Sequence, residues 1–267
     1  MTLDLYFAGY LAIGAFVGFF AGMLGIGGGA IMIPLLVMLF ERQGLPHDHL
    51  LHLAVGTGMA TLLFTSVSSV AAHARRGGVR WDIWRAVTPG ILVGGLIGAW
   101  VAKFFSTFGL ALFFALLVFT LAINMLFNRR PKPSRQLPGP LGITVAGFVV
   151  SFLSTMVAIG GAAMTVPLMV LCNVPMLQAV GTAAAIGFPI AVAGTIGYVA
   201  AGWGDPVLPA ATLGYVYVPA LVGVSIASMA LAPLGAKAAH SLPTARLKQA
   251  FAVLLLILST RMLIGLA

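Results

Sequence analysis

The chain has 267 residues, of which 61% are hydrophobic and 7% are charged, whereas a soluble domain carries about 25% charged residues. This composition excludes a water-soluble domain and indicates a polytopic membrane protein surrounded by a lipid bilayer. The formal net charge of +9 would suggest a nucleic-acid partner for a soluble protein, but basic cytoplasmic loops explain it here, so we expect no nucleic-acid partner.

Apolar segments follow one another along the chain in two sets of five. Long segments suit spanning helices, which need ~20 residues, so an all-α fold is expected. One segment in each set, 30–40 and 163–173, is too short to cross a bilayer at ~1.5 Å per residue. The first set is 3–24, 30–40, 53–74, 84–104 and 108–127, and the second is 141–158, 163–173, 177–200, 211–234 and 247–266.

The start of the chain, Met1 to Asp4, has no basic region and no clear cleavage site. We therefore expect no signal peptide, and the first apolar segment should stay in the mature protein.

A glycine-rich break precedes each short segment. Residues 25–34 read Gly-Ile-Gly-Gly-Gly-Ala-Ile-Met-Ile-Pro, and residues 158–167 read Ala-Ile-Gly-Gly-Ala-Ala-Met-Thr-Val-Pro. Each glycine costs a helix about 1 kcal/mol relative to alanine, and in hydrocarbon the freed backbone groups need partners. A broken helix at membrane depth is typical of transporters that present backbone N–H groups to a substrate. The repetition predicts two copies of one unit, each built around an interrupted helix.

Charged residues predict how the two copies are oriented. Cytoplasmic loops carry an excess of Lys and Arg, and following the spans from such loops gives the two halves opposite orientations. We therefore predict an inverted-topology repeat with halves 1–127 and 141–267, joined by a cytoplasmic linker at 128–140. The basic residues that cluster in three loops are Arg75, Arg76, Arg80 and Arg85, then Arg129, Arg130, Lys132 and Arg135, then Lys237, Arg246 and Lys248, whereas Asp4, Glu41, Asp48 and Asp205 fall on the opposite side.

This topology places both chain termini on the extracytoplasmic side of a bacterial-type inner membrane. The short segments would then be parts of re-entrant helix hairpins that enter from opposite faces, with their glycine tips meeting at the centre. Ten full crossings with thin or tilted ends fit the charge pattern as well.

The glycine breaks are the candidate substrate site. A helix N-terminus presents unpaired N–H groups and about half a positive charge, which makes an anion site. Close helix packing through small residues is the alternative, but the duplication and the short helices favour binding. The hydroxyls of Thr57 and Thr182 follow Gly56 and Gly181 and could donate to a substrate oxygen, unless they bond back to their own helix. The predicted substrate-binding glycines are Gly27, Gly28, Gly29, Gly160 and Gly161.

Few ionisable residues lie within the apolar segments. His73 could gate transport or carry a proton, and the alternative is an ordinary residue at a helix end near the membrane surface. His47, His49 and His52 with Asp48 could suggest a metal site, but an outer loop favours solvated side chains.

Several classes of chemistry are excluded by missing motifs. The single cysteine, Cys172, excludes a multi-cysteine metal site, and the sequence contains no P-loop, nucleophile elbow or zinc-protease motif. We expect no metal, no cofactor and no enzymatic activity, including ATP hydrolysis.

The chain carries several short motifs. In the first half they are Gly-Met-Leu-Gly-Ile-Gly-Gly-Gly at 22–29 with Pro34, Gly56-Thr57, and His-Ala-Arg-Arg-Gly-Gly-Val-Arg-Trp at 73–81, and in the second half they are Gly160-Gly161 with Pro167 and Gly181-Thr182. At these motifs the sequence resembles the TauE/SafE family of sulfite and organosulfonate exporters, and the resemblance covers most of the chain. Arg80 stands where the family pattern has aspartate, and the second half has Ala158 and Ala162 where the first half has Gly25 and Gly29.

The resemblance implies a secondary transporter of small sulfur-containing anions such as sulfite or sulfonates, or of small organic acids. Protons are a candidate coupling ion. An anion channel with the same pocket and a membrane-anchored partner subunit remain as alternatives.

Overall fold

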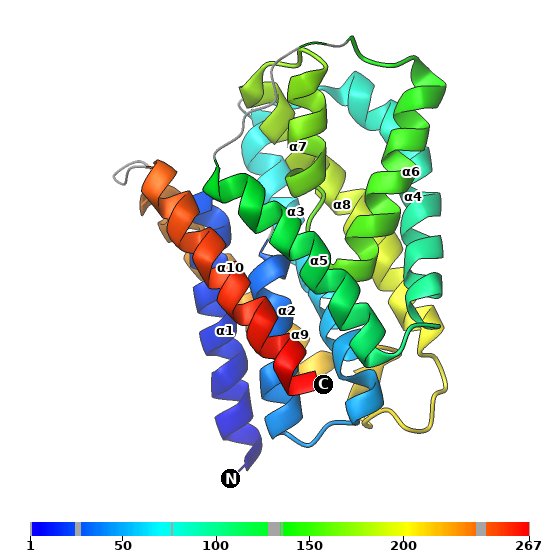
Figure 1. Ribbon diagram of the computed structural model, residues 1–267, viewed down its shortest axis with the longest axis vertical. Helices are drawn as coiled ribbons and strands as arrows, with labels where there is room; N and C mark the ends of the chain where they lie inside the picture. Colours follow the sequence, from blue (N-terminus) through cyan, green and yellow to red (C-terminus); the bar gives the residue numbers. More distant parts are fainter. Residues whose placement is uncertain are drawn as a thin grey trace.

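The computed structural model describes residues 2–24, 28–75, 77–127, 134, 136–238 and 244–266. Within this part of the chain ten α-helices run in sequence (Figure 1). The first half contains α1 (Thr2–Leu24), α2 (Gly29–Arg42), α3 (Leu50–Arg75), α4 (Trp81–Ala102) and α5 (Thr107–Leu126), with a 3-10 turn η1 (His47–His49), and the second half contains α6 (Pro140–Val157), α7 (Ala162–Leu171), α8 (Met176–Ala201), α9 (Val218–Ala238) and α10 (Thr244–Leu266).

Helix lengths divide the ten helices into two groups. Among the described residues, eight helices are long and apolar enough to cross a membrane, which confirms an all-α, multi-pass membrane protein. The other two are α2, with 14 residues, and α7, with 10 residues. At ~1.5 Å per residue they reach only ~21 Å and ~15 Å, so the two predicted short helices are confirmed.

One predicted helix begins later than expected. The hydropathy pattern predicts a helix over 211–234, but β1 (Thr212–Leu213) and β2 (Val216–Tyr217) form a small antiparallel hairpin before α9 begins at Val218. Gly214 makes the turn with a φ of +54°, and a Cβ on it would lie 2.1 Å from the carbonyl oxygen of Val199. The chain can turn this close to α8 only because residue 214 is glycine.

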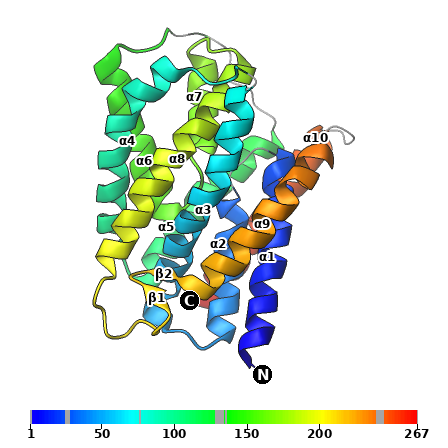
Figure 2. The same cartoon turned by 180° about the vertical axis from the view of Figure 1, so that it is seen from behind.

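The largest packing contacts join helices from different halves. Helix α1 packs chiefly on α9, and α6 packs chiefly on α4. Helices α3 and α8 also pack on each other, as do α5 and α10. Figure 2 shows α3 and α8 side by side in the middle of the structure. The counterpart of α1 in the second half is α6, and the counterpart of α4 is α9. The α1–α9 contact and the α6–α4 contact therefore join corresponding helices.

Two glycine stripes allow these pairs to pack closely. In each stripe glycine recurs at every fourth position, and the facing helix places its carbonyl oxygens where Cβ atoms would otherwise be. The four-residue spacing of these glycines is visible in the sequence itself. Gly14, Gly18 and Gly22 of α1 face Val224, Ser228 and Ala232 of α9, and Gly90, Gly94 and Gly98 of α4 face Thr144, Phe148 and Phe152 of α6.

Candidate substrate site

The two short helices begin in the same way. The carbonyl of Gly28 caps α2 and accepts hydrogen bonds from the backbone N–H groups of Ile31 and Met32, at 3.2 and 3.0 Å. The carbonyl of Gly161 caps α7 and accepts from the backbone N–H groups three and four residues later, at 3.2 and 2.9 Å. Pro34 and Pro167 are each the sixth residue of their helix. N–H groups that precede the first such bond have no partner within the helix.

The two glycine breaks touch each other. Ala158 caps the C-terminus of α6 directly after Val157, and its φ of +47° is left-handed. A Cβ on Gly29, the first residue of α2, would lie only 1.7 Å from the carbonyl oxygen of Ala158. The two breaks can approach this closely only because residue 29 lacks a side chain.

The other predicted glycines fit less tightly. A Cβ on Gly28 would lie 2.4 Å from Cγ1 of Val17, and a Cβ on Gly161 would lie 2.5 Å from Cδ1 of Ile190. Both atoms belong to side chains rather than backbone. The carbonyl of Gly160 accepts a hydrogen bond from the backbone N–H of Ala163 at 3.3 Å, and Gly27 lies outside the described residues.

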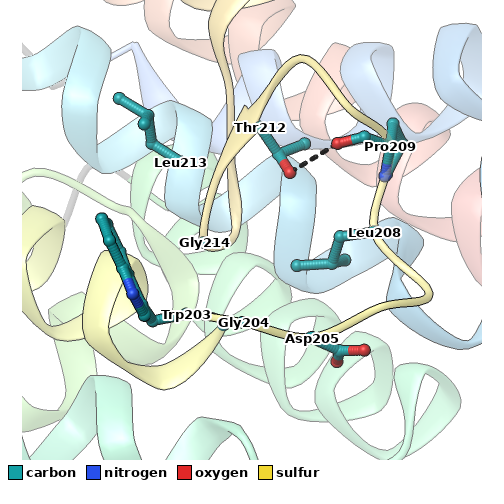
Figure 3. Close-up of a pocket in the computed structure, with 9 residues that line it drawn as sticks. Trp203, Gly204, Asp205, Leu208, Pro209, Thr212, Leu213 and Gly214 are labelled. Carbon is teal, nitrogen blue, oxygen red and sulfur yellow. Dashed lines mark hydrogen bonds between the residues drawn. The ribbon is translucent and has the colours of Figure 1, made fainter.

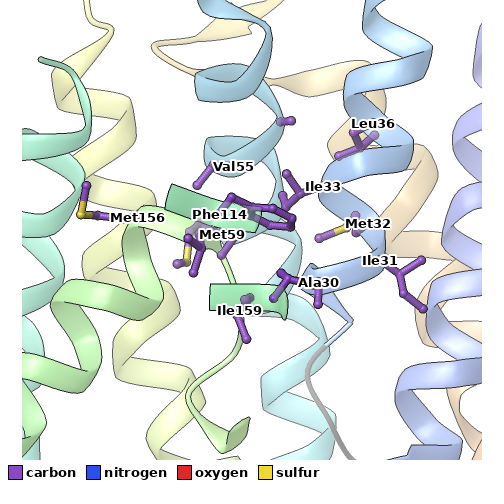
Figure 4. Close-up of a cluster of buried hydrophobic side chains, with 14 of the residues drawn as sticks. Ala30, Ile31, Met32, Ile33, Leu36, Val55, Met59, Phe114, Met156 and Ile159 are labelled. Atoms are coloured by element: carbon purple, nitrogen blue, oxygen red, sulfur yellow. The ribbon is translucent and has the colours of Figure 1, made fainter. Parts of the chain in front are cut away.

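Apolar side chains close over the tips. Met32 and Ile33 of α2, Met59 of α3 and Phe114 of α5 are almost fully buried in one cluster with Ile159 of the second break (Figure 4). Helix α3 approaches closely enough that a Cβ on its Gly58 would lie 2.8 Å from Cδ1 of Ile33. Gly29 at the first break and Ile159 at the second are themselves buried in this arrangement.

The two predicted threonines have backbone partners in the opposite half. The hydroxyl of Thr57 accepts a hydrogen bond from the backbone N–H of Tyr217, and the hydroxyl of Thr182 accepts one from the backbone N–H of Arg80, both at 2.9 Å. Both threonines are fully buried. A role as substrate donors stays a prediction for these hydroxyls.

His73 lies far from the tips in the last turn of α3, where its carbonyl accepts a hydrogen bond from the backbone N–H of Gly78 at 3.1 Å. Arg75 ends the same helix and is exposed. This position agrees with a helix-end residue, and a role in gating or proton coupling stays a prediction.

His49 and His52 do not form the suggested group with His47 and Asp48 but contact Asp205, Ala102 and Tyr215. His49 Nε2 lies 3.6 Å from Asp205 Oδ2, and His52 Nε2 lies 3.0 Å from the carbonyl oxygen of Ala102. Both rings lie against Tyr215, with centroid distances of 5.6 and 5.2 Å. Burial raises the pKa of Tyr215, and the negative charge of Asp205 raises it further. Across the described ranges, no group of three His, Cys, Asp or Glu residues could hold a metal ion.

A cavity lies beside this cluster. It has a volume of about 200 Å³ and lies in the connection from α8 to β2 (Figure 3). Asp205 lines it, and the hydroxyl of Thr212 donates to the carbonyl oxygen of Pro209 at 2.8 Å. A second cavity of about 130 Å³ between α4, α6, α7 and α8 is apolar. The glycine breaks line neither cavity.

Comparison with known families decides the class of this protein. A family model described as "Sulfite exporter TauE/SafE" matches residues 10–262. The chain belongs to the TauE/SafE family. The resemblance inferred from the motifs is thereby confirmed.

Relatives of this TauE/SafE protein occur in bacteria and archaea. A "Probable membrane transporter protein" of Haemophilus influenzae is 30% identical over 94% of this chain and 96% of its own length. "Probable membrane transporter protein YdhB" of Bacillus subtilis is 29% identical, covering 88% of this chain and 91% of its own length. "Probable membrane transporter protein MJ0441" of Methanocaldococcus jannaschii is 26% identical over 72% of each chain. No solved structure matches the chain significantly.

Proposed function

We propose that this TauE/SafE protein is a secondary transporter that exports small sulfur-containing anions such as sulfite or organosulfonates. Family membership and the names of the relatives support a membrane transporter. The observation that carries the mechanism is the contact between the two glycine breaks, where Gly29 meets Ala158 and the start of α2 lies beside the second break.

The substrate site would be made of backbone amides. Each short helix carries the equivalent of about half a positive charge at its N-terminus. A low-dielectric interior strengthens the attraction of this partial charge for an anion. The hydroxyl groups of Thr57 and Thr182 could still donate after a change in conformation, because a hydroxyl both donates and accepts. The amides that we assign to the site are those of Gly27, Gly28 and Gly29 with Gly160 and Gly161.

Alternating access would follow from an inverted repeat of residues 1–127 and 141–267, joined by the linker 128–140. The exchanged helix pairs support this reading, since α1 packs on α9 as α6 packs on α4. The apolar cluster over the tips requires a change in conformation before an anion can enter. A channel would instead need a continuous path for the anion, so the burial of Gly29 and Ile159 beside this apolar cluster favours a carrier.

Transport by purified protein in proteoliposomes tests the proposal. Sulfite, thiosulfate, sulfoacetate, taurine, acetate and chloride would be compared, with and without a pH gradient. We expect saturable transport of sulfite or sulfonates, accelerated by unlabelled substrate on the opposite side. Currents that neither saturate nor show exchange would indicate a channel, selectivity for acetate would indicate an organic-acid carrier, and silence from folded protein would contradict transport of these anions.

Leucine at the tips tests the location of the site. Gly28→Leu and Gly161→Leu should abolish transport because the new side chains would collide with Val17 and Ile190 and displace the tip amides. Gly187→Leu is the control because a Cβ on Gly187 meets nothing within 4 Å. Normal transport by folded Gly28→Leu and Gly161→Leu proteins would rule out the two-tip site.

A further inference from the structure

The paired motif Gly-Thr makes the same contact twice, at opposite ends of the molecule. Thr57 lies near the start of α3 and contacts the residue just before α9, whereas Thr182 lies near the start of α8 and contacts the residue just before α4. Because α3 and α8 run antiparallel, the two contacts lie towards opposite ends (Figure 2).

The glycine of each motif makes the close approach possible. A Cβ on Gly56 would lie 2.4 Å from the carbonyl oxygen of Tyr215, and a Cβ on Gly181 would lie 2.2 Å from that of Gly78. In both cases the glycine contacts the carbonyl two residues before the N–H that the threonine accepts. The same contact, in which a Gly-Thr pair packs on a carbonyl and accepts from an N–H two residues later, is therefore formed twice, once from each half onto the other.

Each hydroxyl serves a backbone group that lacks a helical partner. Tyr217 and Arg80 immediately precede α9 and α4, and N–H groups at a helix start have no acceptor within the helix. Thr57, Thr182 and Tyr217 are buried, so water cannot readily replace the hydroxyl at the Tyr217 contact. Losing the acceptor would leave a buried donor unpaired, which is costly.

We propose that Thr57 and Thr182 are positioning residues of the transport cycle, each acting as a latch that holds one end of the molecule closed. The Thr57 latch closes the end that carries the β1–β2 hairpin, and the Thr182 latch closes the end that joins α3 to α4. The inference rests on the proposed alternating access, in which one latch opens while the other stays closed.

Removing one latch should shift the population towards opening at one end of the molecule, and removing the other latch should shift it towards opening at the opposite end. Thr57→Val keeps the shape of the side chain but removes the acceptor, and the unpaired Tyr217 N–H penalises only the state in which that end is closed. The population therefore shifts towards opening at the β-hairpin end. Thr182→Val shifts it towards opening at the other end, while Thr57→Ser and Thr182→Ser keep the acceptor.

Two symmetry-related reporters can measure these shifts. In a Cys172→Ser background, Val216→Cys reports on the Thr57 latch and Val79→Cys reports on the Thr182 latch. Both valines are buried, and each lies in the sequence between the two residues that contact the Gly-Thr motif: Val216 between Tyr215 and Tyr217, and Val79 between Gly78 and Arg80. The rate of labelling by a membrane-impermeant maleimide would be followed in proteoliposomes that hold the protein in one orientation or the other. Thr57→Val should raise labelling at Val216→Cys about tenfold and lower it at Val79→Cys, and Thr182→Val should do the reverse.

Serine variants that label like the unsubstituted protein would support the hydrogen bond as the cause. The latch proposal is overturned if both valine variants raise labelling at both reporters, if serine behaves like valine, or if neither valine variant changes labelling. Thr57→Ala and Thr182→Ala replace any valine variant that does not fold. Labelling needs no substrate, so opposite shifts without sulfite transport would contradict the proposed substrate alone, and transport without opposite shifts would contradict the latches alone.

Discussion

Gly181 and Gly187 lie in one helix but differ in how much room a side chain would have. A Cβ on Gly181 would lie 2.2 Å from a backbone oxygen, whereas one on Gly187 would meet nothing within 4 Å. Both lie in α8, so helix propensity affects them alike.

Gly181→Ala should therefore lower the stability of the folded protein by roughly 1–3 kcal/mol, because the backbone must move apart. Gly187→Ala should leave it unchanged or raise it by up to about 1 kcal/mol. Thermal unfolding in detergent measures both. Equal unfolding temperatures for the two variants would show that the close approach at Gly181 carries no stability.

His73 allows a second test of a single residue. If it carries the coupling proton, His73→Gln should make sulfite transport insensitive to an imposed pH gradient while transport at equal pH continues. His47→Gln, at an exposed histidine of the opposite loop, is the matched control. A response to the gradient that survives in His73→Gln would remove this residue from coupling.

At the scale of helices, the α1 stripe decides how closely α1 packs on α9. A Cβ on Gly18 would lie 2.4 Å from the carbonyl oxygen of Ser228, whereas one on Gly9 of the same helix would meet only the end of the Leu39 side chain at 3.0 Å. Gly18→Ala should therefore lower the unfolding temperature in detergent much more than Gly9→Ala, because only the first separates two backbones. Similar losses for both would argue against tight backbone packing at the stripe.

Helix positions followed closely from the sequence, whereas the β-hairpin was missed. Hydropathy and glycine breaks are local properties, so the short helices were predicted within a few residues of their observed bounds. Residues 212–217, Thr-Leu-Gly-Tyr-Val-Tyr, do carry a strand signal in their β-branched and aromatic side chains around a glycine. That signal was hidden because these residues are also apolar and adjoin the apolar helix α9.

At the scale of the whole molecule, the orientation in the membrane is open to direct measurement. In a Cys172→Ser background, we expect Asp48→Cys to be labelled by an impermeant maleimide from outside intact cells and Arg75→Cys only after permeabilisation. Asp48 in η1, just before α3, and Arg75, the last residue of α3, are both exposed, so access to the reagent should depend only on the side of the membrane. The reverse pattern would invert the topology, and labelling of both from outside would contradict a spanning α3.

The amino-acid sequence by itself determined the class, the helices, the paired glycine breaks and the family, because hydropathy, helix breakers and motifs are encoded in neighbouring residues. Only the tertiary structure decided which helices pack across the halves and what occupies the centre. It brings Thr57 to a backbone N–H 160 residues away and Thr182 to one 102 residues away. It also brings His49 to Asp205 and closes Met32 and Met59 over the tips. Such contacts depend on helix packing between distant segments, which no local pattern in the sequence specifies.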